Sequence, residues 1–131
     1  MKKKLLAIFV ICMSNAWAGF TYVTENEDAK FYVDTDTIKK VNKKVKFWSL
    51  KNLNSPKQVG NDPPYQSTKS LEATDCELET RQNLYSIFYS GLNGNGHTVF
   101  TIDEAQKETP IIPDTTGASV HRFVCNFKDK R

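Results

Sequence analysis

The sequence predicts an α+β domain in which about six mostly antiparallel strands form a sheet, a C-terminal helix packs on it and one disulfide is present. Three observations support this fold class. Short stretches of β-branched and aromatic residues recur along the chain between turn-forming residues. One stretch near the C-terminus instead repeats its apolar residues at helical spacing. Two cysteines remain in the expected mature chain, and an even pair in an exported protein is expected to form a disulfide.

The first 18 residues have the pattern of a cleaved secretory signal peptide. Lys2–Lys4 supply the positive start, residues 5–13 the apolar segment, and Ala16 and Ala18 the small residues that a signal peptidase requires. A lipid-attachment site requires small residues before its cysteine, whereas large apolar residues precede Cys12. We therefore expect no lipid at Cys12 and cleavage after Ala18. Nine apolar residues are too few to cross a bilayer, so we expect no membrane span after cleavage.

The remaining residues, 19–131, are expected to form one small domain, because two separate cores would each be too small to be stable. The signal removes three of the 18 basic residues and none of the 15 acidic ones, which leaves 15 of each and a net charge of zero. The signal predicts an exported protein, periplasmic or secreted, with the cell surface as a further location. The charge balance removes the main argument for a nucleic-acid partner, and we expect none.

Cys76 and Cys125 are the two cysteines of the mature chain. A disulfide between them would close a loop of about 50 residues, which the chain-entropy account values at about 4 kcal/mol. A redox or metal pair is the alternative, but there is no C-x-x-C motif and neither His97 nor His121 has a zinc-ligand spacing. We therefore expect a structural disulfide, no metal and no cofactor.

The N-terminal half contains three expected strands, at residues 20–24, 30–34 and 43–52. Between the second and the third, Asp36 or Thr37 is suited to cap one or two helical turns over residues 34–41. Residues 54–64 hold three prolines and a glycine without apolar periodicity, which predicts a loop.

The C-terminal half contains three more expected strands, at residues 65–79, 81–92 and 97–103, the last two joined by a glycine-rich hairpin connection over residues 91–96. Thr109–Pro113 is expected to end any strand.

A helix is expected to follow, capped by Asp114 or Thr115. Its apolar stripe consists of Val120, Phe123, Val124 and Phe127. Cys125 flanks this stripe, so a bridge to Cys76 would tie the helix to the sheet.

No catalytic motif is present, and we expect no enzyme. There is no G-x-S-x-G sequence, and His97 and His121 are expected to be solvated. A hydrolase would require one of them to lie beside a serine or carboxylate in a pocket. Asp34 and Asp36 resemble the start of a calcium loop, but lysines follow where its glycine and a further ligand belong.

Five lysines fall within eight residues and form a candidate binding patch with two aromatic residues that we expect to be exposed. The patch consists of Lys39, Lys40, Lys43, Lys44, Lys46, Trp48 and Tyr65. It suits an anionic partner such as a glycan, an acidic matrix protein or lipopolysaccharide. The alternative is a solvated edge that blocks sheet-to-sheet pairing, neutralised by the acidic residues between positions 72 and 79.

A series of short motifs follows along the mature chain: Tyr32-x-Asp34, Asp36-Thr-Ile38, Val45-x-Phe47-Trp48-x-Leu50, Ser67-x-Lys69-Ser70, Asp75-Cys76, Arg81, Tyr85 to Tyr89, Ile112-Pro113 and Cys125. In this order, and with the export signal, they resemble the bacterial surface-adhesin protein E-like domain family. The resemblance implies an antiparallel sheet with a C-terminal helix and one disulfide. It supplies no site residues, because the family's ligand-binding residues form no motif that maps onto this sequence.

The resemblance also implies a non-enzymatic role in binding host extracellular-matrix or plasma proteins. The alternative is a soluble periplasmic accessory protein that binds an envelope component or a small ligand on the aromatic face of its sheet. Joint exposure of Trp48 and Tyr65 beside the lysines would favour a macromolecular partner. A closed apolar pocket within the sheet would favour a small ligand.

Overall fold

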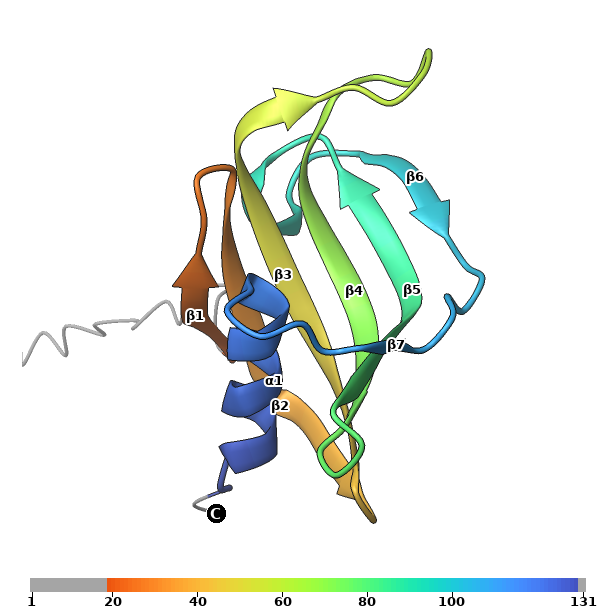
Figure 1. Ribbon diagram of the computed structural model, residues 1–131. Coiled ribbons are helices and arrows are strands. Elements are labelled where there is room, and N and C mark those ends of the chain that lie inside the picture. The colour runs from red at the N-terminus through yellow and green to blue at the C-terminus, as the bar shows by residue number, and fades with distance from the viewer. Residues whose placement is uncertain (1–18, 130–131) are drawn as a thin grey trace, which may run out of the picture.

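The computed structural model describes residues 19–129, in which a curved antiparallel sheet carries an α-helix on its inner side (Figure 1). The strands are β1 (Phe20–Glu25), β2 (Ala29–Val41), β3 (Lys44–Lys57), β4 (Tyr65–Asp75), β5 (Thr80–Tyr89), β6 (Thr98–Ile102) and β7 (Thr109–Pro110). The α-helix is α1 (Thr116–Asn126), and a 3₁₀ turn, η1 (Leu92–Gly94), lies between β5 and β6. The predicted fold class is confirmed, and the predicted signal peptide lies outside the described residues.

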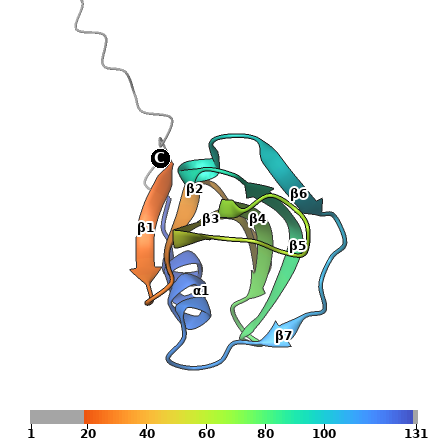
Figure 2. The ribbon, with the colours of Figure 1, turned by 90° about the horizontal axis from the view of Figure 1, so that it is seen from above.

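The sheet is a meander in which each strand pairs with the next, in the order β1-β2-β3-β4-β5-β6, while β7 pairs with β5. All of these pairs are antiparallel. Seen from above, the sheet curves around the side on which α1 lies (Figure 2). We call that side the helix face and the opposite side the outer face.

Two tight turns at one end of the sheet set the register of its central strands. Asn42, between β2 and β3, has a φ of 59°, in the left-handed region that asparagine tolerates. Between β4 and β5, the Asp75 carboxylate accepts the backbone N–H groups of Glu77 and Leu78, each at 2.9 Å. The Leu78 bond is the main reason that the pKa of Asp75 lies below its ordinary value.

The core lies between the helix face and α1. Along Lys44–Phe47, β3 alternates exposed and buried residues, as expected for a strand with one covered face. The buried cluster consists of Val33, Val45 and Phe47 from the sheet and Val120 and Val124 from α1. Removal of these side chains from water is the main force that holds the helix on the sheet.

Both ends of α1 are fixed by polar contacts, and a disulfide fixes its last turn. The Thr115 hydroxyl accepts a backbone N–H of the first turn at 3.2 Å, so Thr115 is the cap. The Lys40 ammonium donates to the carbonyl oxygens of Cys125 and Phe127, at 3.3 and 2.7 Å. The predicted Cys76–Cys125 bridge is confirmed and joins the helix to the end of β4.

The expected helical turns over residues 34–41 are wrong, because β2 continues through Val41. The pairing of β2 with β3 is broken between Asp34 and Lys39. Within this break the Thr37 hydroxyl accepts the backbone N–H of Trp48 at 3.0 Å, in place of a main-chain partner. The Asp and Thr residues that suggested a helix cap therefore support a bulge in a long strand.

Several boundaries also differ from expectation. The strands expected over residues 65–79 and 81–92 end earlier, at Asp75 and Tyr89. The loop predicted over residues 54–64 begins later, because β3 extends through Lys57, which pairs with Tyr65. Pro56 is tolerated there because the register is already broken after Asn52. The segment expected to end any strand contains β7, whose two residues pair with the start of β5.

We predict that the disulfide supplies a large part of the stability of the domain. Reduction, or the double substitution Cys76→Ala and Cys125→Ala, should lower the free energy of unfolding by about 4 kcal/mol, because it frees a closed loop in the unfolded chain. Denaturant unfolding with and without reductant measures this. The double variant is the control, since reductant should not change it, and equal unfolding of the wild type in both conditions would contradict the prediction.

Candidate functional site

Beyond α1, the helix face of the sheet carries a cavity of about 390 Å³. Strands β2 to β5 supply most of its wall, and Thr116 and Gly117 at the start of α1 close one side. The wall combines polar and charged side chains of the central strands with the aromatic rings of Phe31, Tyr65 and Phe88. It is therefore a polar cavity with an aromatic side, rather than the closed apolar pocket that would have favoured an apolar small ligand.

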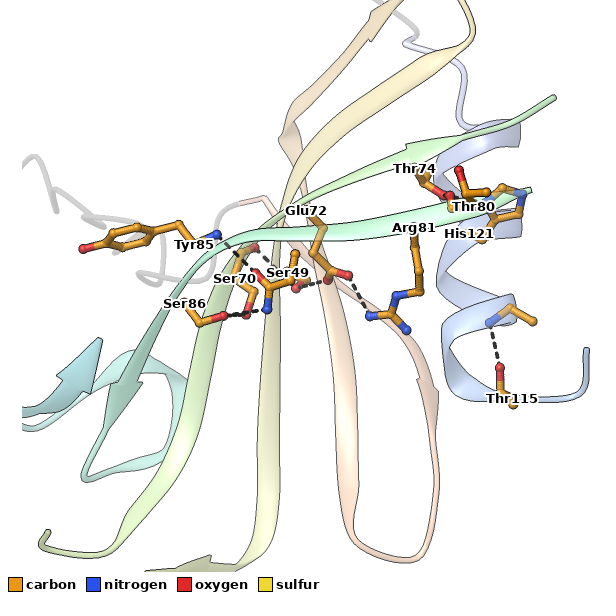
Figure 3. A network of polar contacts seen from close by, with 12 residues as sticks. Ser49, Ser70, Glu72, Thr74, Thr80, Arg81, Tyr85, Ser86, Thr115 and His121 are labelled. Carbon is orange, nitrogen blue, oxygen red and sulfur yellow. Dashed lines mark hydrogen bonds and ion pairs between the residues drawn. The ribbon is translucent and has the colours of Figure 1, made fainter. Parts of the chain in front are cut away.

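A buried carboxylate organises the polar part of this cavity (Figure 3). Glu72 on β4 is 8% exposed, and both of its oxygens are bonded. Its Oε1 accepts from Arg81 Nη2 at 2.9 Å, and its Oε2 accepts the Ser49 hydroxyl proton at 2.5 Å. The antiparallel register places these three residues, from three adjacent strands, on the same face.

A second chain of hydrogen bonds lies beside the first. The hydroxyl oxygens of Ser70 and Ser86 are 2.8 Å apart, and Asn83 Nδ2 donates to Ser86 Oγ at 2.8 Å. Asn83 Oδ1 also accepts the backbone N–H of Tyr85 at 3.2 Å, where the pairing of β4 with β5 shifts. This shift makes room for an extra residue in β5 and keeps both Asn83 and Ser86 on the helix face, where they line the cavity.

Lys51 is the second cation of the cavity, and no carboxylate of residues 19–129 forms an ion pair with it. Its ammonium lies 5.7 Å from the centre of the Phe31 ring. Burial lowers the pKa of Lys51, and the positive charges of Lys57 and Arg81 lower it further, whereas the negative charge of Asp28 raises it. The cavity thus holds a half-buried cation that forms no ion pair with a carboxylate of the cavity wall, while the charge of Asp28 acts on it from outside the wall.

The predicted lysines lie at the end of the β2–β3 hairpin, and all five are exposed. Two of them have structural partners, since Lys40 caps α1 and Lys43 forms an ion pair with Glu77 at 2.5 Å. The other three, Lys39, Lys44 and Lys46, lie on the outer face, because Val45 and Phe47 between them point to the core. The expected neutralisation by acidic residues is therefore found in part: Glu77 pairs with Lys43, and Asp75 lies opposite Lys44, whose positive charge lowers the pKa of Asp75.

Trp48 and Tyr65 do not lie together. Trp48 is half-buried on the outer face, where its ring packs edge-on against Tyr85 at 6.3 Å; the Tyr85 side chain points away from the Glu72 network (Figure 3). Tyr65 lines the cavity and packs edge-on against Phe88 at 4.8 Å. The structure thus groups Trp48 with three of the lysines and assigns Tyr65 to the other face.

Sequence analysis missed two exposed apolar residues beside the lysines. Val41 is 67% exposed at the end of β2, and Leu78 is 69% exposed in the turn between β4 and β5. The two turns are neighbours, since the Cys76 N–H donates to the Lys43 carbonyl oxygen at 2.9 Å. Their placement in or directly beside a tight turn, where an apolar residue has no core to join, is the sequence signal that would have identified them.

The expectation that both histidines are solvated holds for His97, which is exposed, and is wrong for His121. His121 is half-buried, and its Nδ1 lies 2.6 Å from the Thr74 hydroxyl oxygen and 3.8 Å from the sulfur of Cys125. It supports the contact between α1 and β4. Within residues 19–129, no three potential metal ligands come together.

These features define a small α+β domain in which one antiparallel sheet is tied to its C-terminal helix by a disulfide. The model of the surface-adhesin protein E family matches residues 20–126, and the chain belongs to this family. No helix among the described residues combines the length and the apolar composition needed to cross a membrane.

Solved structures of Haemophilus influenzae protein E have a similar fold. One is 19% identical with a TM-score of 0.64 and covers 82% of this chain and 84% of its own. A second crystal form is 20% identical with a TM-score of 0.67, covering 82% and 87%. The protein from a non-typeable strain is 22% identical with a TM-score of 0.59, covering 79% and 74%. A search of the curated proteins finds no match.

We predict that Glu72→Ala destabilises the domain by about 2 kcal/mol, because it leaves Arg81 and Ser49 without their shared partner. The value is below that of a fully buried pair because the Arg81 side chain is 43% exposed. Lys43→Ala is the matched control: its ion pair is exposed, so the loss should be about 0.5 kcal/mol or less. Equal losses in denaturant unfolding would contradict this ranking.

Proposed function

We propose that this chain is an exported, non-enzymatic binding domain whose partner is a protein of the host extracellular matrix or plasma. Membership of a family of surface adhesins is the observation that carries the proposal. The signal-peptide pattern of the first 18 residues supports export. The polar side chains of the cavity bond to one another rather than forming a nucleophile beside a histidine, which supports binding over catalysis.

The surface proposed for this partner lies at the end of the sheet where the two tight turns meet, with its lysines on the outer face. We call it the hairpin-end surface; it consists of Lys39, Val41, Lys44, Lys46 and Leu78. Its three lysines form no ion pair within residues 19–129, and its two apolar side chains are mostly exposed. Exposed apolar groups among unpaired cations suit an acidic protein surface, since the charges steer encounter and the apolar contacts add affinity.

We predict that charge reversal on this surface weakens matrix binding. The variant Lys39→Glu, Lys44→Glu, Lys46→Glu should bind immobilised basement-membrane extract at least about tenfold more weakly than wild type in surface plasmon resonance, because three attractive contacts become repulsive. The control is Lys30→Glu, Lys57→Glu, Lys107→Glu, which makes the same charge change at exposed lysines outside the surface. It should bind within about twofold of wild type.

Two results would count against the proposal. If the two triple variants lose binding equally, net charge rather than the hairpin-end surface governs the interaction. If wild-type protein does not bind the extract or serum proteins at all, matrix binding is not the function.

A second prediction concerns location. Protease treatment of intact cells should degrade a tagged copy of this protein while a periplasmic control protein survives, because an adhesin must be displayed outside the outer membrane. Immunoblotting of the tag measures this. Protection until the outer membrane is opened would contradict surface display and favour a periplasmic role.

The cavity favours a second candidate function, in which the domain is a periplasmic accessory protein that captures an envelope component or a small ligand. Its volume of about 390 Å³ falls within the range of small-molecule sites. Its location on the helix face separates this function from the hairpin-end surface.

A further inference from the structure

We infer that the cavity on the helix face is a binding site for a monovalent organic carboxylate with an apolar or aromatic body, with the carboxylate held by Lys51 and Arg81. Such a site deepens the second candidate function and does not depend on matrix binding, because it lies on the other face of the sheet from the hairpin-end surface.

The charges of the cavity wall are the first argument. Lys51, Glu72 and Arg81 are the charged side chains that line it, two cations against one carboxylate. Glu72 is already engaged through both oxygens, by Ser49 and by Arg81. One positive charge is therefore left without a partner among the side chains of the wall. Asp28, outside the wall, raises the pKa of Lys51 but forms no ion pair with it, so a monovalent anion bound in the cavity is the direct partner that the ammonium lacks.

The position of the two cations is the second argument. Lys51 lies on β3 and Arg81 at the start of β5, and β4 with Glu72 runs between them. Arg81 uses Nη2 for Glu72, and its Nη1 reaches toward Gly117, where a side-chain carbon would collide with it. The absence of a side chain at residue 117 leaves room for this guanidinium beside the cavity. Both cations line the same cavity, and the charge of Arg81 lowers the pKa of Lys51, so the carboxylate of the proposed ligand would lie between them.

The aromatic side of the wall is the third argument. Phe31 lies below the Lys51 ammonium, and Tyr65 and Phe88 form an edge-on pair with 4.8 Å between their centres. Phe88 is also stacked on Phe100, with 4.1 Å between their centres, which holds its ring in place. These rings offer an apolar surface beside the cations, which suits a ligand with an anionic head and an apolar body.

A monovalent carboxylate fits this site better than a phosphate. The wall has one positive charge in excess, whereas a phosphate monoester brings about 1.5 to 2 negative charges at neutral pH. A phosphate monoester would therefore bring more negative charge than the wall can balance beside the Glu72 carboxylate, and inorganic phosphate in addition has no apolar group for the aromatic side to bind.

The test is a titration of the whole mature domain, residues 19–131, followed by ¹H–¹⁵N NMR. The probes are 3-phenylpropionate, its neutral analogue 3-phenylpropionamide, and inorganic phosphate. We expect saturable shifts of cavity amides such as Ser49 and Glu72 with the carboxylate, and about tenfold weaker binding of the amide. Equal affinity for acid and amide, tighter binding of phosphate, or shifts confined to the outer face would each overturn the proposal.

Two variants separate binding from folding. Lys51→Met removes the charge but keeps a chain of similar length, and it should weaken 3-phenylpropionate binding at least about tenfold. Glu72→Gln keeps the polar shape and removes the opposing negative charge, so it should strengthen binding, which mere structural damage would not do. Lys30→Met, an exposed lysine on the outer face, is the control and should leave binding within about twofold of wild type. Unchanged binding in Lys51→Met, or weaker binding in Glu72→Gln, would overturn the proposal.

A further readout ties the ligand to Lys51 itself. A carboxylate bound beside the ammonium should raise the pKa of Lys51, which burial now holds below its ordinary value. The ¹³Cε resonance of Lys51, titrated with and without 3-phenylpropionate, reports this change, and an unchanged titration contradicts the proposal. The triple lysine variant of the hairpin-end surface should bind the probe as wild type does, so failure of matrix binding and failure of this site are distinguishable.

Discussion

The packing of α1 against one half of the sheet is the constraint on which the rest of the structure depends. The helix packs mainly over β1, β2 and β3, where the sheet offers Val33, Val45 and Phe47. The disulfide and the Lys40 cap hold its last turn there. The apolar core ends where α1 no longer covers the sheet. At that place the residues of β3 on the helix face change from apolar Phe47 in the core to polar Ser49 in the cavity wall. The cavity exists because the curved sheet continues past its only α-helix in residues 19–129.

A sheet face without a helix cover can be filled with polar groups only if they satisfy one another. Glu72 is nearly inaccessible to water, so leaving either oxygen unbonded would cost more than the bonds contribute. Ser49 and Arg81 donate hydrogen bonds to the two Glu72 oxygens. A separate series of hydrogen bonds joins Ser70, Ser86 and Asn83. The network therefore holds the middle strands in register in the way that apolar packing holds the strands under α1.

Much of the fold was predictable, because alternating residues, turn residues and one helical stripe each have a local cause. Residues 34–41 were not, since Asp and Thr side chains bond the backbone equally well at a helix cap and at a bulge. The candidate site was predictable only in part. The lysines are contiguous in sequence, but Trp48 and Tyr65 separate onto different faces through the register break after Asn52. The cavity network depends on register and on the β5 bulge, which no local pattern specifies.

Lys46 and Lys51 occupy the same strand and show how differently two lysines can be explained. Lys46 is exposed on the outer face, where solubility is a sufficient reason for a charged side chain. Lys51 is half-buried on the helix face beside a second cation, where its desolvation opposes folding and an apolar residue would be more stable. The Phe31 ring and the charge of Asp28 favour the ammonium, but they offset only part of this cost, because the pKa of Lys51 remains below its ordinary value. A bound carboxylate gives a reason for a lysine at this position, because its negative charge stabilises the buried ammonium and the ammonium gives the site its preference for an anion.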